Sequence, residues 1–190
     1  MIGILKVMKE QQVVLVNQND EPIGVMEKME AHQKGLLHRA FSVFIFDSQG
    51  KMLLQQRAVK KYHGAQLWTN ACCSHPFPGE QVSDAAQRRL KEELGFTAEL
   101  HEIFSFTYKA RVENGLTEHE YDHVFAGEYE NEIQPDPDEV LACYFENMGW
   151  IKKEIETEPE KFTEWFKIAF PQIEKWWKEK YGATIVERGT

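Results

Sequence analysis

Residues 80–95 read EQVSDAAQRRLKEELG, and this stretch gives the strongest indication of the fold. Apolar residues recur every four positions from Ala86 to Leu94, which predicts a helix over 83–94 with one buried face. Gly95 follows where this helix should end, because glycine adopts the left-handed conformation that closes a helix C-terminus. The stretch therefore predicts a loop, a helix and a sharp stop.

The sequence around this helix predicts mainly strands. Residues 41–58 contain two apolar runs joined by Asp-Ser-Gln-Gly, which is typical of a β-hairpin. Proline marks residues 134–140 as a loop. The other expected elements are strands within 12–24, 98–112 and 119–130, and helices near 158–169 and 171–181, the second beginning at Pro171.

Strands on both sides of one well-marked helix, followed by a helical C-terminal part, predict an α/β fold. We expect an α+β sandwich in which helices flank a mixed β-sheet. A chain of 190 residues is long enough to bury such a core without disulfides. We therefore expect a single domain over 1–190, with 1–12 as a possible N-terminal extension and 157–190 as the helical C-terminal part.

The composition argues against several classes of protein. A net charge of −9 disfavours nucleic-acid binding, which requires a basic face. No apolar run approaches the roughly 18 residues of a membrane span, so we expect no membrane partner. Three cysteines, an odd number, disfavour a disulfide framework and suit a reducing cytosol. We expect a cytoplasmic protein that is a monomer or a weak homo-oligomer.

Two short segments carry side chains that are suited to chemistry. Residues 70–75 read NACCSH, which fits a metal clamp, a nucleophile beside its base, or ordinary buried thiols. Alternation along a strand places Glu118, Glu120 and Asp122 on one face, where three carboxylates repel one another unless a cation or water lies among them. A solvated edge strand and a metal site are both compatible with this pattern. Histidines that could complete a metal site occur in segments expected to be loops or loop–strand junctions, at His32, His38 and His75.

The spacing of charges along 80–95 resembles the Nudix box, the loop–helix–loop of enzymes that act on diphosphates. The matching residues are Glu80, Arg88, Glu92, Glu93 and Gly95. Ser74 replaces the first glycine of the box, and Arg89 replaces the glutamate that follows its arginine. Loss of that carboxylate should weaken the metal cluster that activates water for hydrolysis, whereas an arginine would bind a diphosphate oxygen directly. The resemblance implies a Nudix-like fold with altered hydrolytic machinery.

Four segments in order make the resemblance more specific: AHQKGLLHRAFSVFIF, LWTNACCSHPFPGE, RRLKEELG and TEHEYDHVF. Together they are similar to type I isopentenyl-diphosphate isomerases, metal-dependent enzymes of isoprenoid synthesis with a Nudix fold. The similarity spans roughly residues 13–170. It implies interconversion of isopentenyl diphosphate and dimethylallyl diphosphate, with isopentenyl diphosphate as the small-molecule substrate.

The resemblance also implies roles for individual residues. The expected ligands of Mn²⁺ or another divalent cation are His32, His38, His75, Glu118 and Glu120. Glu93 matches the residue that helps a second ion, Mg²⁺, bridge to the diphosphate. The expected catalytic residues are Cys73, Glu120 and Tyr108, and the expected substrate-binding residues are Lys28, Arg57, Lys61, Arg89 and Trp165. Cys72 and Cys143 are expected to be buried thiols, and Trp68 fits a core aromatic as well as a pocket residue.

The implied reaction explains why such residues are needed. Moving a double bond requires a proton to be added at one carbon and removed from another, and an unactivated alkene is a very weak base. Protonation creates a tertiary carbocation, which survives only where water is excluded and π-rich or negative groups face it. Two alternatives remain: a Nudix hydrolase of a nucleoside diphosphate derivative, and a non-catalytic module that binds a metal or a diphosphate.

Overall fold

The structure, a computed structural model, describes residues 12–188. The elements in chain order are β1 (Gln12–Val16), β2 (Pro22–Glu27), α2 (Lys28–Lys34), β3 (His38–Phe46), β4 (Met52–Arg57), β5 (Trp68–Thr69), β6 (Cys72–Ser74), α3 (Val82–Leu94), β7 (His101–Arg111), β8 (Thr117–Glu128), β9 (Val140–Glu146), α4 (Met148–Thr157) and α5 (Glu164–Arg188). Within the described residues, no helix combines the length and the apolar character that crossing a membrane requires.

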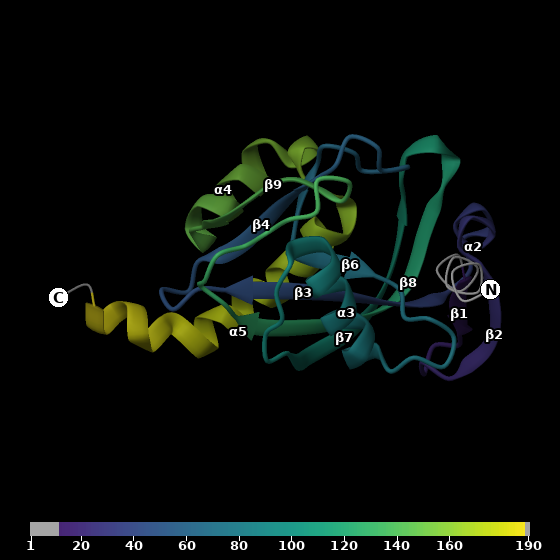
Figure 1. Ribbon diagram of the computed structural model, residues 1–190, viewed down its shortest axis with the longest axis horizontal. Helices are drawn as coiled ribbons and strands as arrows, with labels where there is room; N and C mark the ends of the chain where they lie inside the picture. Colours follow the sequence, from purple (N-terminus) through teal and green to yellow (C-terminus); the bar gives the residue numbers. More distant parts are fainter. Residues whose placement is uncertain (1–11, 189–190) are drawn as a thin grey trace.

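The strands form one mixed sheet with β3 near its centre (Figure 1). Strand β3 pairs in parallel with β8 and antiparallel with β1, β4 and β6. β2 lies beside β1, β5 and β9 pair with β4, and β7 pairs with β8. The predicted mixed sheet is confirmed.

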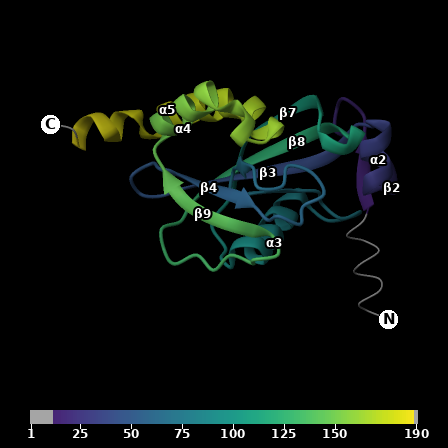
Figure 2. The same cartoon turned by 90° about the horizontal axis from the view of Figure 1, so that it is seen from above.

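Helices cover both faces of this sheet, with α4 and α5 on one side and α3 on the other (Figure 2). Successive side chains of β3 point to opposite faces of the sheet, so this one strand contributes residues to two hydrophobic cores. Phe44 and Phe46 pack in the core that includes α4 and α5, whereas Val43 and Ile45 pack in the core that includes α3. The predicted sandwich of a sheet between helices is therefore confirmed.

The predicted helix over 83–94 is α3, and its last turn shows why glycine follows it. Leu90 and Leu94 are fully buried. Gly95 has a φ of 79°, and its N–H donates to the Lys91 carbonyl at 3.0 Å. A Cβ at this position would lie 2.6 Å from the backbone oxygen of Gln134, so a larger residue would displace the loop that packs there.

The predicted hairpin of residues 41–58 is confirmed, since β3 and β4 run antiparallel on either side of the turn. The strands expected on either side of residue 115 are also present. β7 and β8 pair over their length, from His101 opposite Ala126 to Arg111 opposite Thr117. β8 thus lies between β7 and β3, and the alternative of a solvated edge strand for residues 118–123 is wrong.

Several expectations about helices and loops are wrong. His32 lies in α2 rather than in a loop, and Gly35 ends this short helix in the left-handed conformation. α4 and β9 were not expected, because a short strand that directly follows the proline-rich loop and a ten-residue helix give little periodic signal. The possible extension 1–12 lies outside the described residues except for Gln12, the first residue of β1.

The two helices expected near 158–169 and 171–181 are largely one helix, α5, which begins only at Glu164 and continues through Pro171. Proline inside a helix costs about 3 kcal/mol, because it removes a backbone hydrogen bond and crowds the preceding turn. Buried aromatic and aliphatic residues flank the proline on both sides, at Phe166, Phe170 and Ile173. Burial of this continuous apolar face offsets the local cost.

Candidate functional site

A cavity of about 80 Å³ opens beside the end of the sheet where β3, β6, β7 and β8 meet. Its walls come from segments far apart in the sequence, including α2, the loop after β4 and the start of α5. The lining residues are Lys28, His32, Phe41, Ser42, Arg57, Tyr62, His63, Cys73, Ser74, His75, Tyr108, Glu118, Glu120 and Trp165. This volume suits a few non-hydrogen atoms of a ligand, so a larger ligand must extend out of the cavity.

The imidazoles of His32 and His38 are held in one tautomer by the backbone. The Nδ1 atom of His32 lies 2.7 Å from the carbonyl oxygen of Lys28, and that of His38 lies 2.8 Å from the carbonyl oxygen of Leu36. A carbonyl oxygen can only accept a hydrogen bond, so each Nδ1 carries the proton. In the neutral imidazole, Nε2 then carries the lone pair that binds a metal.

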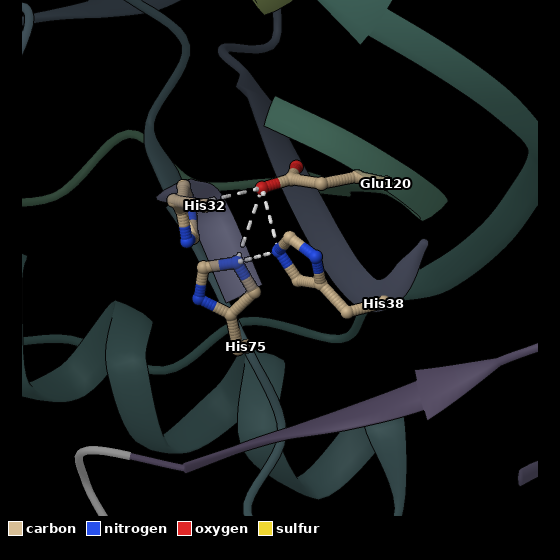
Figure 3. A group of neighbouring side chains, drawn as sticks. All are labelled: His32, His38, His75 and Glu120. Atoms are coloured by element: carbon tan, nitrogen blue, oxygen red, sulfur yellow. Dashed lines mark hydrogen bonds and ion pairs between the residues drawn. The ribbon is translucent and has the colours of Figure 1, made fainter. Parts of the chain in front are cut away.

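The Nε2 atoms of three histidines face one carboxylate oxygen (Figure 3). Oε1 of Glu120 lies 3.1 Å from Nε2 of His75, 3.5 Å from Nε2 of His38 and 3.9 Å from Nε2 of His32. The Nε2 atoms of His38 and His75 are 3.2 Å apart. All four ligand atoms lie within 4.8 Å of one another. Lone pairs brought this close repel unless a proton or a cation lies between them, and three imidazoles with one carboxylate fit a divalent transition metal.

The surroundings of His32, His75 and Glu120 favour the protonation states that bind a metal. Burial lowers the pKa of His75 to about 3 and also lowers the pKa of His32, so both imidazoles are neutral at pH 7. Burial alone would raise the pKa of Glu120, but His38 and His75 outweigh it and hold that pKa well below its usual range. Neutral imidazole and ionised carboxylate are the forms that coordinate metals.

The sheet register explains how the ligand atoms meet. Parallel pairing of β3 with β8 places His38 directly beside Glu120, although the two are 82 positions apart in the sequence. Antiparallel pairing of β7 with β8 places Tyr108 on the other side of Glu120, and its hydroxyl donates to Oε2 of Glu120 at 2.7 Å. His75 directly follows β6, which pairs with β3.

Cys73 lies in the same cavity, in a network of polar side chains. Its thiol donates to Oδ1 of Asn70 at 3.0 Å, and its sulfur lies 3.5 Å from the hydroxyl of Ser42. The Asn70 amide nitrogen donates to two buried backbone carbonyls, which fixes its oxygen toward the thiol. Burial and the nearby charge of Asp122 raise the pKa of Cys73 well above its ordinary value. The group that lines the cavity is therefore the thiol rather than the thiolate.

The three carboxylates expected on one face of β8 are all buried, with Glu118, Glu120 and Asp122 at 3%, 7% and 1% exposure. The predicted common face is confirmed, but the three have different partners. Glu118 lies outside the four-residue cluster of Figure 3, with its oxygens 3.2 Å from the Tyr108 hydroxyl and 3.5 Å from Nε2 of His63. Its role as a metal ligand stays a prediction. Burial, followed by the charge of Glu120, raises the pKa of Glu118 well above its usual value.

The expected substrate-binding residues fall into two groups. Lys28, Arg57 and Trp165 line the cavity, and the Arg57 guanidinium lies 5.0 Å from the centre of the Trp165 ring. Lys61 and Arg89 instead lie beside Glu139, with which both form ion pairs. Burial lowers the pKa of Lys28, and the charges of Lys61 and Arg89 lower it further. Lys61 and Arg89 therefore lie near enough to Lys28 for their charges to act on its amine.

Glu93, the expected Mg²⁺ ligand, is only 2% exposed. One of its oxygens accepts from Nη2 of Arg89 at 2.6 Å, and the other accepts from the side chain of Gln55 at 3.1 Å. Cys72 is fully buried, as expected, with its sulfur 3.5 Å from Glu93. Cys143, which was also expected to be a buried thiol, is only half-buried on β9. Trp68, which the sequence left open, is half-buried and packs edge-on against Tyr144.

Comparison with known proteins identifies the family. The family model for the NUDIX domain matches residues 36–166. The isopentenyl-diphosphate Delta-isomerase of Pectobacterium atrosepticum is 48% identical over 167 residues, which cover 88% of this chain and 93% of that protein. The isomerase of the same name from Serratia proteamaculans is 48% identical over 172 residues, which cover 88% of this chain and 96% of that protein.

This chain belongs to the isopentenyl-diphosphate Delta-isomerase family. Solved structures share its fold at low sequence identity. A Deinococcus radiodurans protein matches with a TM-score of 0.71 at 15% identity, covering 85% of this chain and 98% of that one. A MutT Nudix hydrolase from Burkholderia pseudomallei matches with a TM-score of 0.57 at 22% identity, covering 72% of this chain and 98% of that one. These likenesses show the Nudix fold alone.

Several residues around the site of this isomerase-family chain were not predicted. Ser42 lies four residues after His38 on β3, so the alternation of a strand could have placed both on one face. Tyr62, His63 and Glu139 lie in loops or at a loop end, where no periodic pattern indicates which way a side chain points.

Burial of His63 should make the stability of the folded protein depend on pH. Burial, followed by the charge of Arg57, lowers the pKa of His63 from 6.5 to about 3. Between these two values the unfolded chain holds a proton on His63 that the folded chain does not, so stability falls as the pH falls. Relative to His63→Gln, the free energy of unfolding should decrease by about 1.4 kcal/mol per pH unit below 6.5. Urea titrations of both proteins at several pH values would show this, and a pH-independent difference would contradict it.

Proposed function

We propose that the site described above carries out the isomerase reaction of its family, the interconversion of isopentenyl diphosphate and dimethylallyl diphosphate. The observation that carries this proposal is one cavity that is lined by a half-buried thiol, a buried carboxylate and a compact set of metal-ligand atoms. Two groups that can each hold one proton, Cys73 and Glu120, meet the need for a proton to be added and another removed. We also propose that the protein works in the cytoplasm, which its free cysteines support.

We assign the divalent cation, Mn²⁺ or another transition metal, to His32, His38, His75 and Glu120, with Glu118 as a further candidate ligand. A bound cation supplies positive charge that tunes the acidity of the Glu120 carboxyl group. Tyr108 holds that carboxyl group from its other oxygen, by the 2.7 Å hydrogen bond. His75 contacts one oxygen of Glu120 and Tyr108 contacts the other, so the carboxyl group has little freedom to rotate. This favours proton exchange with a substrate carbon at one position.

Cys73 is the second proton carrier in this proposal. Its thiol donates to Asn70, and burial of the sulfur keeps the thiol uncharged by raising its pKa. One of Cys73 and Glu120 gives a proton to the alkene and the other takes a proton from the neighbouring carbon. Their roles exchange between the forward and reverse directions, because the reverse reaction passes through the same steps in the opposite order.

The tertiary carbocation formed between these steps needs an environment that excludes water and is rich in electrons. Trp165 is 5% exposed and lines the cavity, and Arg57 covers part of its ring. We propose that its remaining ring surface faces the cation. The diphosphate would extend from the cavity toward Lys28, Lys61 and Arg89, with Arg57 and a Mg²⁺ held partly by Glu93 as further contacts.

A Nudix hydrolase is the alternative function, and Arg89 of α3 counts against it. Arg89 replaces one carboxylate of the box and pairs with two others. It donates to Glu92 at 2.9 Å and to Glu93 at 2.6 Å. Water activation by a metal cluster requires these carboxylates to be available.

The two functions give different products from isopentenyl diphosphate. The proposal predicts dimethylallyl diphosphate with no release of phosphate, which chromatography and a phosphate assay would measure together. Release of phosphate, or hydrolysis of nucleoside diphosphate derivatives without isomerisation, would favour the hydrolase. Binding without any turnover would favour the non-catalytic module.

The metal assignment predicts the effect of removing one ligand. His75→Ala should lower the affinity for Mn²⁺ by a factor of about 100 or more, because losing a ligand costs at least as much as losing an outer-shell partner. Metal content after dialysis, measured by mass spectrometry, reports this without any activity assay. His101→Ala is the control, since its side chain is 66% exposed on β7. Equal metal content in both variants would contradict the assignment.

A further inference from the structure

Glu139, the last residue before β9, lies between two cations that the proposed function assigns to the diphosphate. Its Oε1 lies 3.2 Å from Nη2 of Arg89 in an ion pair, and its Oε2 accepts from Nζ of Lys61. The side chains of Lys61 and Glu139 are 18% and 26% exposed, so solvent screens this pair only in part. The family resemblance gave this carboxylate no role.

Backbone hydrogen bonds hold Glu139 in place independently of the cations. Its carbonyl accepts from the N–H of Ala58 at 3.0 Å, and its own N–H donates to the Asp136 carbonyl at 3.0 Å. The N–H of Asp136 in turn donates to the Glu93 carbonyl at 2.9 Å. The loop is thereby fixed to the ends of both β4 and α3. The backbone of Glu139 is therefore held near Lys61 and Arg89 whether or not these side chains bind another anion.

Carboxylates surround the guanidinium group of Arg89. Nη1 donates to Glu92 at 2.9 Å and Nη2 donates to Glu93 at 2.6 Å, while Nη2 also lies 3.2 Å from Oε1 of Glu139. A phosphate oxygen that approaches Nη2 from the side of Glu139 must therefore displace that carboxylate. Glu139 is the more exposed of the two partners of Nη2, and it is the one shared with Lys61. Its displacement would free donors on two cations at once.

We propose that Glu139 is an internal counter-anion that competes with the substrate diphosphate for Lys61 and Arg89. The inference rests on the proposed function, which places the diphosphate on these cations. Substrate and product carry the same diphosphate, so competition weakens the binding of both and favours release of the product. If Glu139 instead only positions Lys61 and Arg89 for the diphosphate, removing its charge should weaken diphosphate binding.

Glu139→Gln tests this proposal because it keeps the shape of the side chain and removes its charge. Inorganic pyrophosphate with Mg²⁺ should bind about tenfold more tightly to the variant, as measured by calorimetry. KM for isopentenyl diphosphate should fall by a similar factor while kcat changes less. The gain in affinity should shrink as salt is added, because salt screens the removed charge.

Asp138→Asn is the matched control, since it removes the neighbouring carboxylate of the same loop. Asp138 pairs with Lys60 on the surface, where the two side chains are 77% and 83% exposed, so pyrophosphate affinity should change less than twofold. In a Lys61→Gln background, Glu139→Gln should have a smaller effect than in the wild type, because one of the two competing cations is gone.

The possible outcomes separate this inference from the proposed function. If wild-type protein binds pyrophosphate and Glu139→Gln binds it equally or more weakly, the inference is wrong and the proposed function stands. If neither protein binds pyrophosphate, both the diphosphate site and the inference are wrong. Tighter binding by Glu139→Gln but not by Asp138→Asn supports the inference.

Discussion

Replacing Glu120 by glutamine is expected to lower kcat about 10³-fold, since the variant loses one of the two proton carriers. The substitution keeps the shape of the side chain but places an amide between the Tyr108 hydroxyl and the imidazoles of His38 and His75. It also removes a charged ligand from the cluster, so metal affinity should fall in the same variant. Steady-state kinetics and metal analysis of one preparation would measure both effects.

Glu128→Gln is the control for this variant, because it makes the same change on the same strand far from the cavity. Glu128 is exposed at the end of β8 and pairs with Lys180 and Tyr181. Its kcat should stay within about twofold of wild type, as is usual for surface substitutions. A Glu120→Gln protein with undiminished kcat at saturating metal would contradict the assigned role of Glu120.

Replacing Cys73 by alanine is expected to lower kcat by a similar factor, about 10³, while metal content stays unchanged. Cys73 lines the cavity but lies outside the four-residue cluster, so its loss removes a proton carrier and no ligand. The two variants therefore share a kinetic defect and differ in metal content. This difference separates loss of proton transfer from loss of the metal.

Cys143→Ala is the control for the thiol, since Cys143 is a half-buried cysteine on β9. Circular dichroism melts should show that both cysteine variants fold, and only Cys73→Ala should lose activity. Activity that survives in Cys73→Ala and disappears in Cys72→Ala would assign the thiol role to the neighbouring residue instead.

The sequence predicted those parts of the fold that depend on local patterns. The four-residue spacing before Gly95 gave α3, and the alternation of residues 118–123 correctly placed three carboxylates on one face. Local patterns could not show that β8 pairs in parallel with β3, because such pairing joins segments far apart in the chain. They also failed at Pro171, where burial of a long apolar face outweighs the intrinsic cost of proline in a helix.

The sequence predicted those site residues that match the motifs of a known family. It did not predict which residues pair with one another, because tertiary contacts decide that. His32, His38, His75 and Glu120 were named from matching motifs, and the structure brings their ligand atoms together. Nothing in the sequence indicated that Glu139 would form ion pairs with Lys61 and Arg89. Glu139 ends a loop whose position depends on backbone hydrogen bonds with the ends of α3 and β4.

Proton NMR of isopentenyl diphosphate turnover in D₂O, with Mg²⁺ and Mn²⁺ present, tests the central claim most directly. If Cys73 and Glu120 transfer the protons, the proton added to the alkene comes from a group that exchanges with solvent. The account therefore predicts dimethylallyl diphosphate that carries deuterium in a methyl group. Dimethylallyl diphosphate without deuterium, or no isomerisation by metal-loaded protein, would contradict it.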